Sequence, residues 1–217
     1  MSGEVLAKLD TAGTLTKKYQ AKSRAPVAAS ILVSQSDAYS VHDAISKLPN
    51  RTLVLSQSGR REVRLNFARF LPIAALYEKL LKLVGKRLSD PGIDQERNRG
   101  AALHRAVCEV LDMSGSCDTG SFPDVIEQLL EVKLQTAATI DLGLVSPDDA
   151  TPLEFLPSIR HCDVRYAVYY ATIIGREVQI DHLVLARGAD FFSCFQRFEG
   201  RVVNAKLQIP LPRDFFG

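Results

Sequence analysis

Two carboxylates and a lysine lie close together in the segment 122–135. Asp124 precedes Glu131 by seven residues, and Lys133 follows inside an apolar run. Because the side chains of a strand alternate between its two faces, this pattern predicts that Glu131, Lys133 and Gln135 share one face while the intervening apolar residues point into a core. Burying these polar groups has a desolvation cost, which a divalent cation bound by Asp124 and Glu131 would offset. The spacing therefore predicts a metal-dependent site for phosphodiester cleavage.

The short connection between the two acids predicts how they meet. Pro123 cannot donate to a sheet ladder, so it marks the start or edge of a strand. The pair Glu127-Gln128 is the expected turn between two short strands, and the resulting hairpin brings Asp124 back toward Glu131. Two neighbouring carboxylates repel each other unless a cation lies between them. The hairpin therefore predicts a cation site.

The residue types around this hairpin indicate which metal it would bind. Oxygen ligands with no His or Cys nearby suit Mg²⁺, or Mn²⁺ in its place, better than zinc. The backbone carbonyl of Val132 is a candidate third oxygen ligand. Lys133 is expected to orient or deprotonate a water molecule and to stabilise charge on the phosphate. Gln135 is a candidate contact to metal-bound water or DNA, with simple solvent exposure as the alternative.

The same acid and lysine pattern resembles that of the PD-(D/E)XK nuclease superfamily, and within it the type II restriction endonucleases. The residues that carry the resemblance are Pro123, Asp124, Glu131, Val132 and Lys133. The match covers about residues 97–136. It implies a restriction-endonuclease-like core, with Asp124 and Glu131 as metal ligands and Lys133 as the third catalytic residue.

An upstream helix completes the metal site in relatives of this kind, with a Gly-x-x-Leu-Glu pattern whose Glu lies near the metals. The comparable segment here is 99–104, and His104 stands where the family has Glu. Glu109, further along the same helix, is a candidate substitute. His104 and Glu109 are therefore accessory site candidates, and ordinary core or surface roles remain the alternatives for both.

Composition places the chain among ordinary globular proteins. Its 217 residues are 46% hydrophobic and 24% charged, which predicts a single domain spanning 1–217. No apolar run is long enough to span a bilayer, and no secretory signal is visible. Four scattered cysteines without a C-x-x-C pair predict reduced thiols and a cytoplasmic location, and the resemblance implies a prokaryotic cell. Phosphate-loop and dinucleotide motifs are absent from the sequence, so no nucleotide cofactor is expected.

Charge is distributed unevenly along the chain although the net charge is only +2. Residues 1–105 hold 18 Lys and Arg against 9 Asp and Glu, whereas residues 106–217 hold 9 against 16. A basic half can bind the phosphates of double-stranded DNA and an acidic half can carry a metal site, with plain solvated charge as the alternative. Arg97 and Arg99, which precede the site hairpin on one helix, are the candidate phosphate contacts.

Hydrophobic periodicity supplies the elements that must position these residues. Helices are expected at 67–84, where Pro72 opens or kinks the helix, at 98–111, and at 189–198, where four phenylalanines recur. Strands are expected at 51–56, 164–174, 178–186 and in the tail from 201. The segment 141–161 contains three prolines and is expected to be irregular. The predicted fold is α/β, a mixed central β-sheet flanked by helices.

These expectations favour a Mg²⁺-dependent DNA endonuclease of the type II restriction class. Cutting two antiparallel strands symmetrically needs two sites related by a two-fold axis, so a homodimer is expected. A repair or recombination enzyme that nicks DNA or resolves junctions is an alternative. A non-catalytic DNA-binding protein with a relic site is another.

Overall fold

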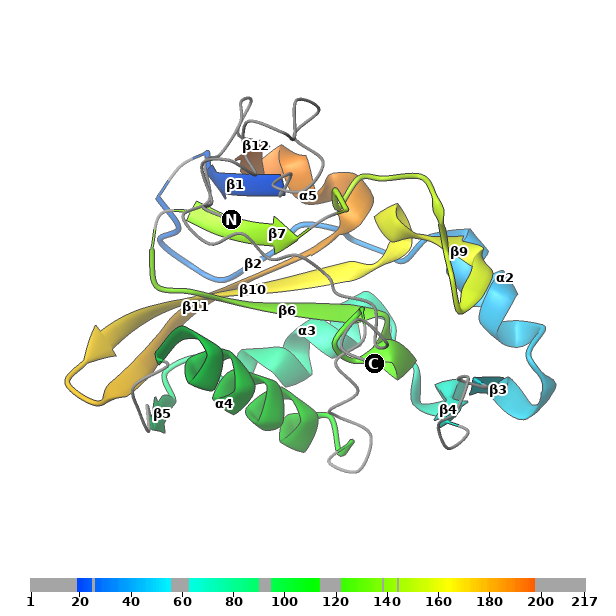
Figure 1. Ribbon diagram of the computed structural model, residues 1–217, viewed down its shortest axis with the longest axis horizontal. Helices are drawn as coiled ribbons and strands as arrows, with labels where there is room; N and C mark the ends of the chain where they lie inside the picture. The colour runs from blue at the N-terminus through cyan, green and yellow to red at the C-terminus, as the bar shows by residue number, and fades with distance from the viewer. Residues whose placement is uncertain are drawn as a thin grey trace, which may run out of the picture.

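The computed structural model describes residues 19–24, 26–55, 63–89, 95–113, 122–137, 139–143 and 145–197. Its largest element is a mixed sheet with the strand order β2-β11-β10-β6, in which β5 pairs with the far end of β11. These strands are β2 (Ile31–Leu32), β5 (Arg87–Ser89), β6 (Leu130–Gln135), β10 (Arg165–Ile174) and β11 (Glu177–Arg187). Figure 1 shows β10 and β11 as a long hairpin that extends beyond the other strands at one end.

The site strand β6 pairs with a strand that is distant in sequence. It runs parallel to β10, with Glu131 opposite Tyr166 and Lys133 opposite Val168. β10 and β11 are antiparallel, with a register shift between Tyr170 and Ala171. Parallel neighbours need a long crossover, which the segment holding β7, β8 and β9 supplies here.

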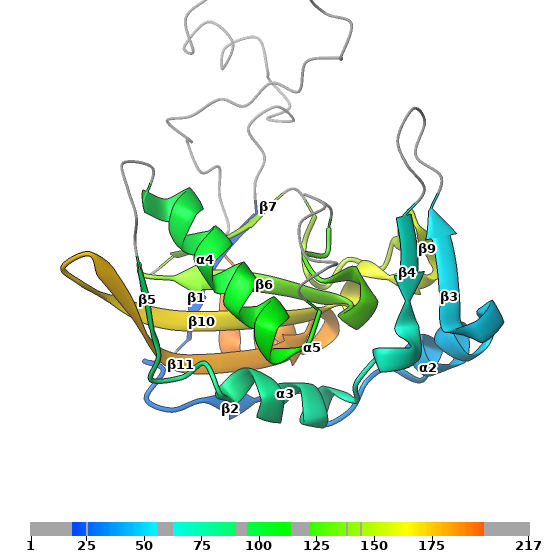
Figure 2. The same cartoon turned by 90° about the horizontal axis from the view of Figure 1, so that it is seen from below.

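Helices α3 (Ile73–Leu81) and α4 (Gln95–Val110) cover one face of this sheet, as Figures 1 and 2 both show. Their apolar residues recur at the spacing of one helix face, so they form a continuous stripe. Leu76 and Leu103 are fully buried in this layer against Leu130 and Tyr169 of the sheet. Val132 and Leu134 pack against the same cluster, so the apolar face predicted for this strand is confirmed.

A second, smaller sheet lies over the opposite face (Figure 1). Its order is β12-β1-β7, formed by β12 (Phe195–Arg197), β1 (Tyr19–Ser23) and β7 (Thr139–Gly143). Helix α5 (Gly188–Cys194) adds Phe191 to the core between the layers, beside Tyr166 and Val168. Glu131 and Lys133 project from β6 on this side, since paired residues of parallel strands point the same way.

The remaining elements gather at the end of the sheet opposite the β10–β11 turn (Figures 1 and 2). They are α2 (Tyr39–Ser46), the hairpin of β3 (Thr52–Leu55) and β4 (Val63–Asn66), and the hairpin of β8 (Pro152–Leu153) and β9 (Leu156–Arg160). Short 3-10 helices lie at Pro49–Arg51, Phe67–Arg69, Ile126–Gln128 and His161–Asp163.

The mixed α/β class predicted from the sequence is confirmed. The strands expected at 51–56, 164–174 and 178–186 and the helix at 98–111 are confirmed with shifted ends. Helix α3 begins only after Pro72, which precedes its first residue. Two predictions are wrong: residues 195–197 form β12 because β1 offers an open edge, and the supposedly irregular 141–161 contains the end of β7 and the whole of β8 and β9. The strand expected from 201 lies outside the described residues.

Two further observations concern the class of the protein. Within the described ranges, no helix is long and apolar enough to cross a membrane. Cys162 and Cys194 are free thiols, as expected. The expectation of reduced thiols is wrong for Cys108, which is disulfide-bonded.

Candidate active site

The connection from Asp124 to Glu131 is a tight hairpin. Val125 and Leu130 exchange backbone hydrogen bonds of 2.9 and 3.1 Å, and a single 3-10 turn, Ile126–Gln128, joins them. Leu129 closes the turn with a φ of 47°, in the left-handed region. The hairpin predicted from the sequence, with its turn at Glu127-Gln128, is therefore confirmed.

The hairpin joins the two acids and the lysine through direct contacts. The Val132 amide donates to Asp124 Oδ2 at 2.8 Å, and the Asp124 amide donates to Glu131 Oε2 at 3.2 Å. Lys133 Nζ forms an ion pair with Glu131 Oε1 at 2.8 Å. These contacts bring Asp124, Glu131, Val132 and Lys133 together, as the spacing predicted.

Burial controls the charges in this group. The side chain of Glu131 is 10% exposed and that of Lys133 is 25% exposed. Desolvation raises the pKa of Glu131, and the nearby charge of Asp124 raises it further, although Lys133 opposes both. Desolvation acts to lower the pKa of Lys133, but the charges of Glu131, Asp124 and Asp141 outweigh it and raise this pKa. Lys133 is therefore a firmly held cation, and Glu131 is a carboxylate that accepts a proton readily.

A pocket of about 540 Å³ opens beside Lys133, between α4, β6 and β7. Its charged wall residues are Arg99 from α4, Lys133 from β6 and Asp141 from β7. Arg99 is only 7% exposed, so it forms part of the pocket wall and not of an open surface. Asp141 is exposed, and its Oδ1 accepts a hydrogen bond from the Gly143 amide at 2.9 Å. Two cations and one acid thus surround a space that borders the site.

Gln135 has a different role from the one expected. It is buried, and its side-chain amide donates to the backbone carbonyls of Ala137 and, at 2.5 Å, Thr139. These bonds close the connection from β6 to β7. The expectation of solvent exposure is wrong, and the amide hydrogens are used internally.

The helix candidates stand apart from the hairpin acids. Glu109 is exposed on α4, and His104 is half-buried with its Nε2 enclosed and without a hydrogen-bond partner in the part of the chain that the structure describes. Over the described ranges, no three His, Cys, Asp or Glu side chains form a group able to hold a metal ion. Neither His104 nor Glu109 therefore joins Asp124 and Glu131 as a third ligand in this arrangement. The side chain of Arg97 lies outside the described residues.

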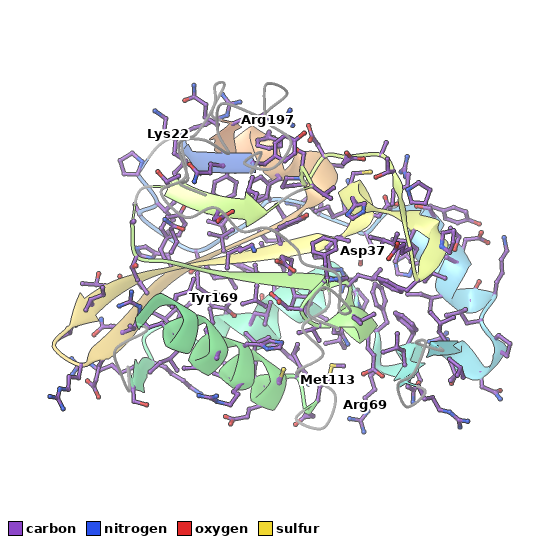
Figure 3. All side chains as sticks on the ribbon, viewed as in Figure 1. Lys22, Asp37, Arg69, Met113, Tyr169 and Arg197 are labelled. Carbon is purple, nitrogen blue, oxygen red and sulfur yellow. The ribbon has the colours of Figure 1, made fainter. Side chains whose placement is uncertain are left out.

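Glu127 and Gln128 anchor the hairpin turn through buried side chains. The sequence predicted only that these two residues form a turn. The Gln128 side chain accepts from the Leu71 amide at 3.1 Å and donates to the Arg69 carbonyl at 2.7 Å. Glu127 accepts a 2.5 Å bond from the Asn66 amide. Figure 3 shows Arg69 and Met113 near each other on the lower side of the molecule, and Met113 also contacts Gln128. The turn is therefore fixed to the segment that precedes α3.

Arg165, at the start of β10, holds the same turn from the other side. Its guanidinium donates to the Gln128 carbonyl at 3.2 Å, to the Leu71 carbonyl at 2.7 Å and to Asp37 Oδ1 at 2.8 Å. The side chains of Arg165 and Asp37 are almost completely buried, at 1% and 2% exposure respectively. The sequence signal for this contact was only that Arg165 opens an otherwise apolar strand; its partner, Asp37, is far away in sequence.

The donor set fits a hard divalent cation. Asp124 and Glu131 provide carboxylate oxygens, and Mg²⁺ is commonly bound by one or two carboxylates while it keeps several waters. Both oxygens of Glu131 are already in use, one by Lys133 and one by the Asp124 amide. The contact to the amide is the longer of the two, at 3.2 Å, so it is the one that a cation would replace.

A scan against protein-family models and searches of curated proteins and of solved structures found no match to this chain.

Proposed function

We propose that this chain is a Mg²⁺-dependent endonuclease with a restriction-endonuclease-like core, which hydrolyses the phosphodiester bonds of double-stranded DNA as a sequence-specific type II enzyme. One observation carries the proposal: the carboxylate of Asp124 accepts a bond from the Val132 amide of β6, beside the buried Glu131 and the half-buried Lys133, which form an ion pair on one face of that strand. A surface ion pair would need none of this burial. The pocket beside Lys133 supports the proposal by providing room for a substrate group.

The residues divide the chemistry between them. Asp124 and Glu131, with the Val132 carbonyl, would hold the metal. When bound, Mg²⁺ supplies charge that polarises the phosphate and acidifies water. A water molecule attacks phosphorus, one phosphorus–oxygen ester bond breaks, and the departing oxygen takes up a proton. Lys133 remains protonated beside Glu131, so it stabilises negative charge on the phosphate better than it accepts a proton from water. The proton that the attacking water loses passes to the surrounding solvent.

Cleavage of a supercoiled plasmid tests the proposal directly. The protein in Mg²⁺ should produce linear fragments, and Asp124→Ala or Glu131→Ala should abolish them while the fold remains intact. The exposed acid Glu154 provides a matched control, since Glu154→Ala removes the same kind of group from the surface. Cleavage by Asp124→Ala or Glu131→Ala at the rate of the unchanged protein would overturn the assignment of the site.

The role of Lys133 has its own test. Lys133→Ala should still bind metal but lose cleavage, whereas Lys82→Ala, at an exposed lysine of the α3 end, should cut normally. Ca²⁺ should support DNA binding without efficient cutting, because its larger coordination shell positions water poorly. A Lys133→Ala variant that cuts at the normal rate would remove the lysine from the mechanism.

The DNA path and the oligomeric state are parts of the same proposal. If Arg99 meets a phosphate within the pocket, Arg99→Ala should lower the slope of log affinity against log salt by about one; an unchanged slope would place the DNA elsewhere.

Mixing unchanged chains with Glu131→Ala chains should give mixed dimers that nick one strand. If activity instead falls in simple proportion to the fraction of unchanged chains, with no excess of nicked circles, the result would favour a monomeric repair enzyme. A chain that binds DNA but never cuts would favour the non-catalytic alternative.

A further inference from the structure

An aromatic stack lies next to the residue that carries the first acid. The rings of Phe122 and His161 are stacked with their centroids 5.2 Å apart and an angle of 26° between their planes. Phe122 is followed by buried Pro123 and then by Asp124, so its position limits where Asp124 can lie. None of the steps assigned above to the site residues uses His161.

His161 itself belongs to a rigid corner. It begins the 3-10 helix His161–Asp163, which leads directly into β10. Its amide donates to the Thr151 carbonyl at 3.0 Å, and its carbonyl accepts from the Val164 amide at 3.0 Å. The ring is therefore carried by a backbone that is bonded on both sides.

The same corner holds the site hairpin at its other end. The Arg165 amide donates to the Leu129 carbonyl at 2.8 Å, just before Glu131. The corner 161–165 thus contacts the segment at two points, through a ring stack two residues before Asp124 and through a backbone bond two residues before Glu131. Two contacts, one near each acid, restrict the backbone positions from which the two carboxylates project.

The environment of the His161 ring favours its neutral form. Its Nδ1 is enclosed and has no hydrogen-bond partner among the described residues. Burial lowers the pKa of the ring, although the charge of Asp149 opposes this shift. A neutral imidazole packs against phenylalanine as a flat, largely apolar ring. A phenylalanine in place of the histidine should therefore preserve the stack.

We propose that His161 is a positioning residue of the candidate active site, which stacks on Phe122 and so holds Asp124 in place to bind a divalent cation together with Glu131. This inference rests on the proposed function. It is separable from it, because a chain can cleave DNA without depending on this ring.

The test compares ring-retaining and ring-removing variants. His161→Leu keeps much of the side-chain volume but removes the ring, and it should raise the Mn²⁺ concentration for half-maximal cleavage by about tenfold or more, as loss of a residue that supports metal ligands commonly does. His161→Phe should restore a value within about threefold of the unchanged protein by the same reasoning. His42→Ala, at a second histidine–phenylalanine contact 6.0 Å from Phe70, is the control and should change little.

A spectroscopic measurement reports the stack without reference to cleavage. The chain contains no tryptophan, so the Phe122→Trp variant has one indole, at the position of interest. Phe122 is already 36% exposed, so adding His161→Leu should expose the indole further and shift its emission to longer wavelength, whereas adding His161→Phe should not.

The outcomes separate the two proposals. Normal cleavage by His161→Leu at the same Mn²⁺ concentration as the unchanged protein would overturn the positioning role and leave the nuclease proposal intact. The same emission maximum with leucine as with histidine would also overturn it. An unchanged protein that neither binds Mn²⁺ nor cuts DNA would overturn both. A raised Mn²⁺ requirement in His161→Leu, together with a normal requirement in His161→Phe, supports both proposals. If the ring served only folding, His161→Leu would lower stability but would not show this selective recovery.

Discussion

Replacing Arg165 by methionine should destabilise the protein more than any exposed charge deletion, because it leaves a buried acid unpaired. The Arg165 guanidinium lies 2.8 Å from Asp37 Oδ1, and the two side chains are 1% and 2% exposed. Methionine fills most of the space and keeps an apolar contact with Phe70, whose ring lies 4.0 Å below the guanidinium. What is lost is mainly charge and hydrogen bonding.

The magnitude follows from the groups that remain. Removing one partner of a buried ion pair costs about 3–5 kcal/mol, since the other charge stays buried. The carbonyls of Gln128 and Leu71 also lose their donor, and each unsatisfied buried group costs about 1–3 kcal/mol where water cannot reach it. Asp37 keeps the hydrogen bond from the Ile73 amide at 2.9 Å and lies 3.9 Å from His42 Nε2, and both contacts limit the loss. We expect a decrease of about 5 kcal/mol in the free energy of unfolding, at the lower end of the sum of these contributions.

Urea unfolding followed by circular dichroism measures this loss. Arg87→Met is the matched control, because Arg87 pairs with Glu177 at 3.4 Å where both side chains are about half exposed; it should cost less than about 1 kcal/mol. The double variant Asp37→Asn, Arg165→Met should be more stable than the two single losses predict, by at least about 1 kcal/mol. Equal losses for Arg165→Met and Arg87→Met would refute the reasoning.

Three other predictions concern the hairpin. The pKa of Glu131 is raised above its ordinary value of 4.5. The stabilisation that protonated Glu131 gives the metal-free protein is therefore present below pH 4.5 and is lost as the pH rises through the raised pKa. The difference in urea midpoint between the unchanged protein and Glu131→Gln should decrease over the same pH range. Mg²⁺ at a hundred times its dissociation constant should stabilise the fold by about 2.7 kcal/mol, or about 5–11 °C in melting temperature, and Asp124→Ala should remove the shift. Gln128→Leu leaves the Leu71 amide and Arg69 carbonyl unpaired and should lower the free energy of unfolding by about 2–6 kcal/mol. A decrease no larger than that caused by replacing an exposed glutamine would mean that water replaces both bonds.

The sequence alone determined the local features of the site. The alternation of apolar and polar residues through β6 assigned Glu131 and Lys133 to one face, because a strand repeats every two residues. The short link from Asp124 to Glu131 allowed only a tight return of the chain, and the structure has one. The amphipathic pattern of α4 and the apolar runs of β10 and β11 likewise depend on neighbours in sequence. Such features are visible in a sequence because their causes are local.

The tertiary structure decided which distant groups surround the hairpin. The parallel pairing of β6 with β10 brings Tyr166 beside Glu131, and the position of β7 brings Asp141 toward Lys133. The same packing buries Gln128, so that its side chain holds the turn in place, and it puts Arg99 in the wall of the pocket. Burial and long-range pairing depend on how whole layers pack against each other. No local pattern of residue types contains that information, so the charge states of the site follow from the fold.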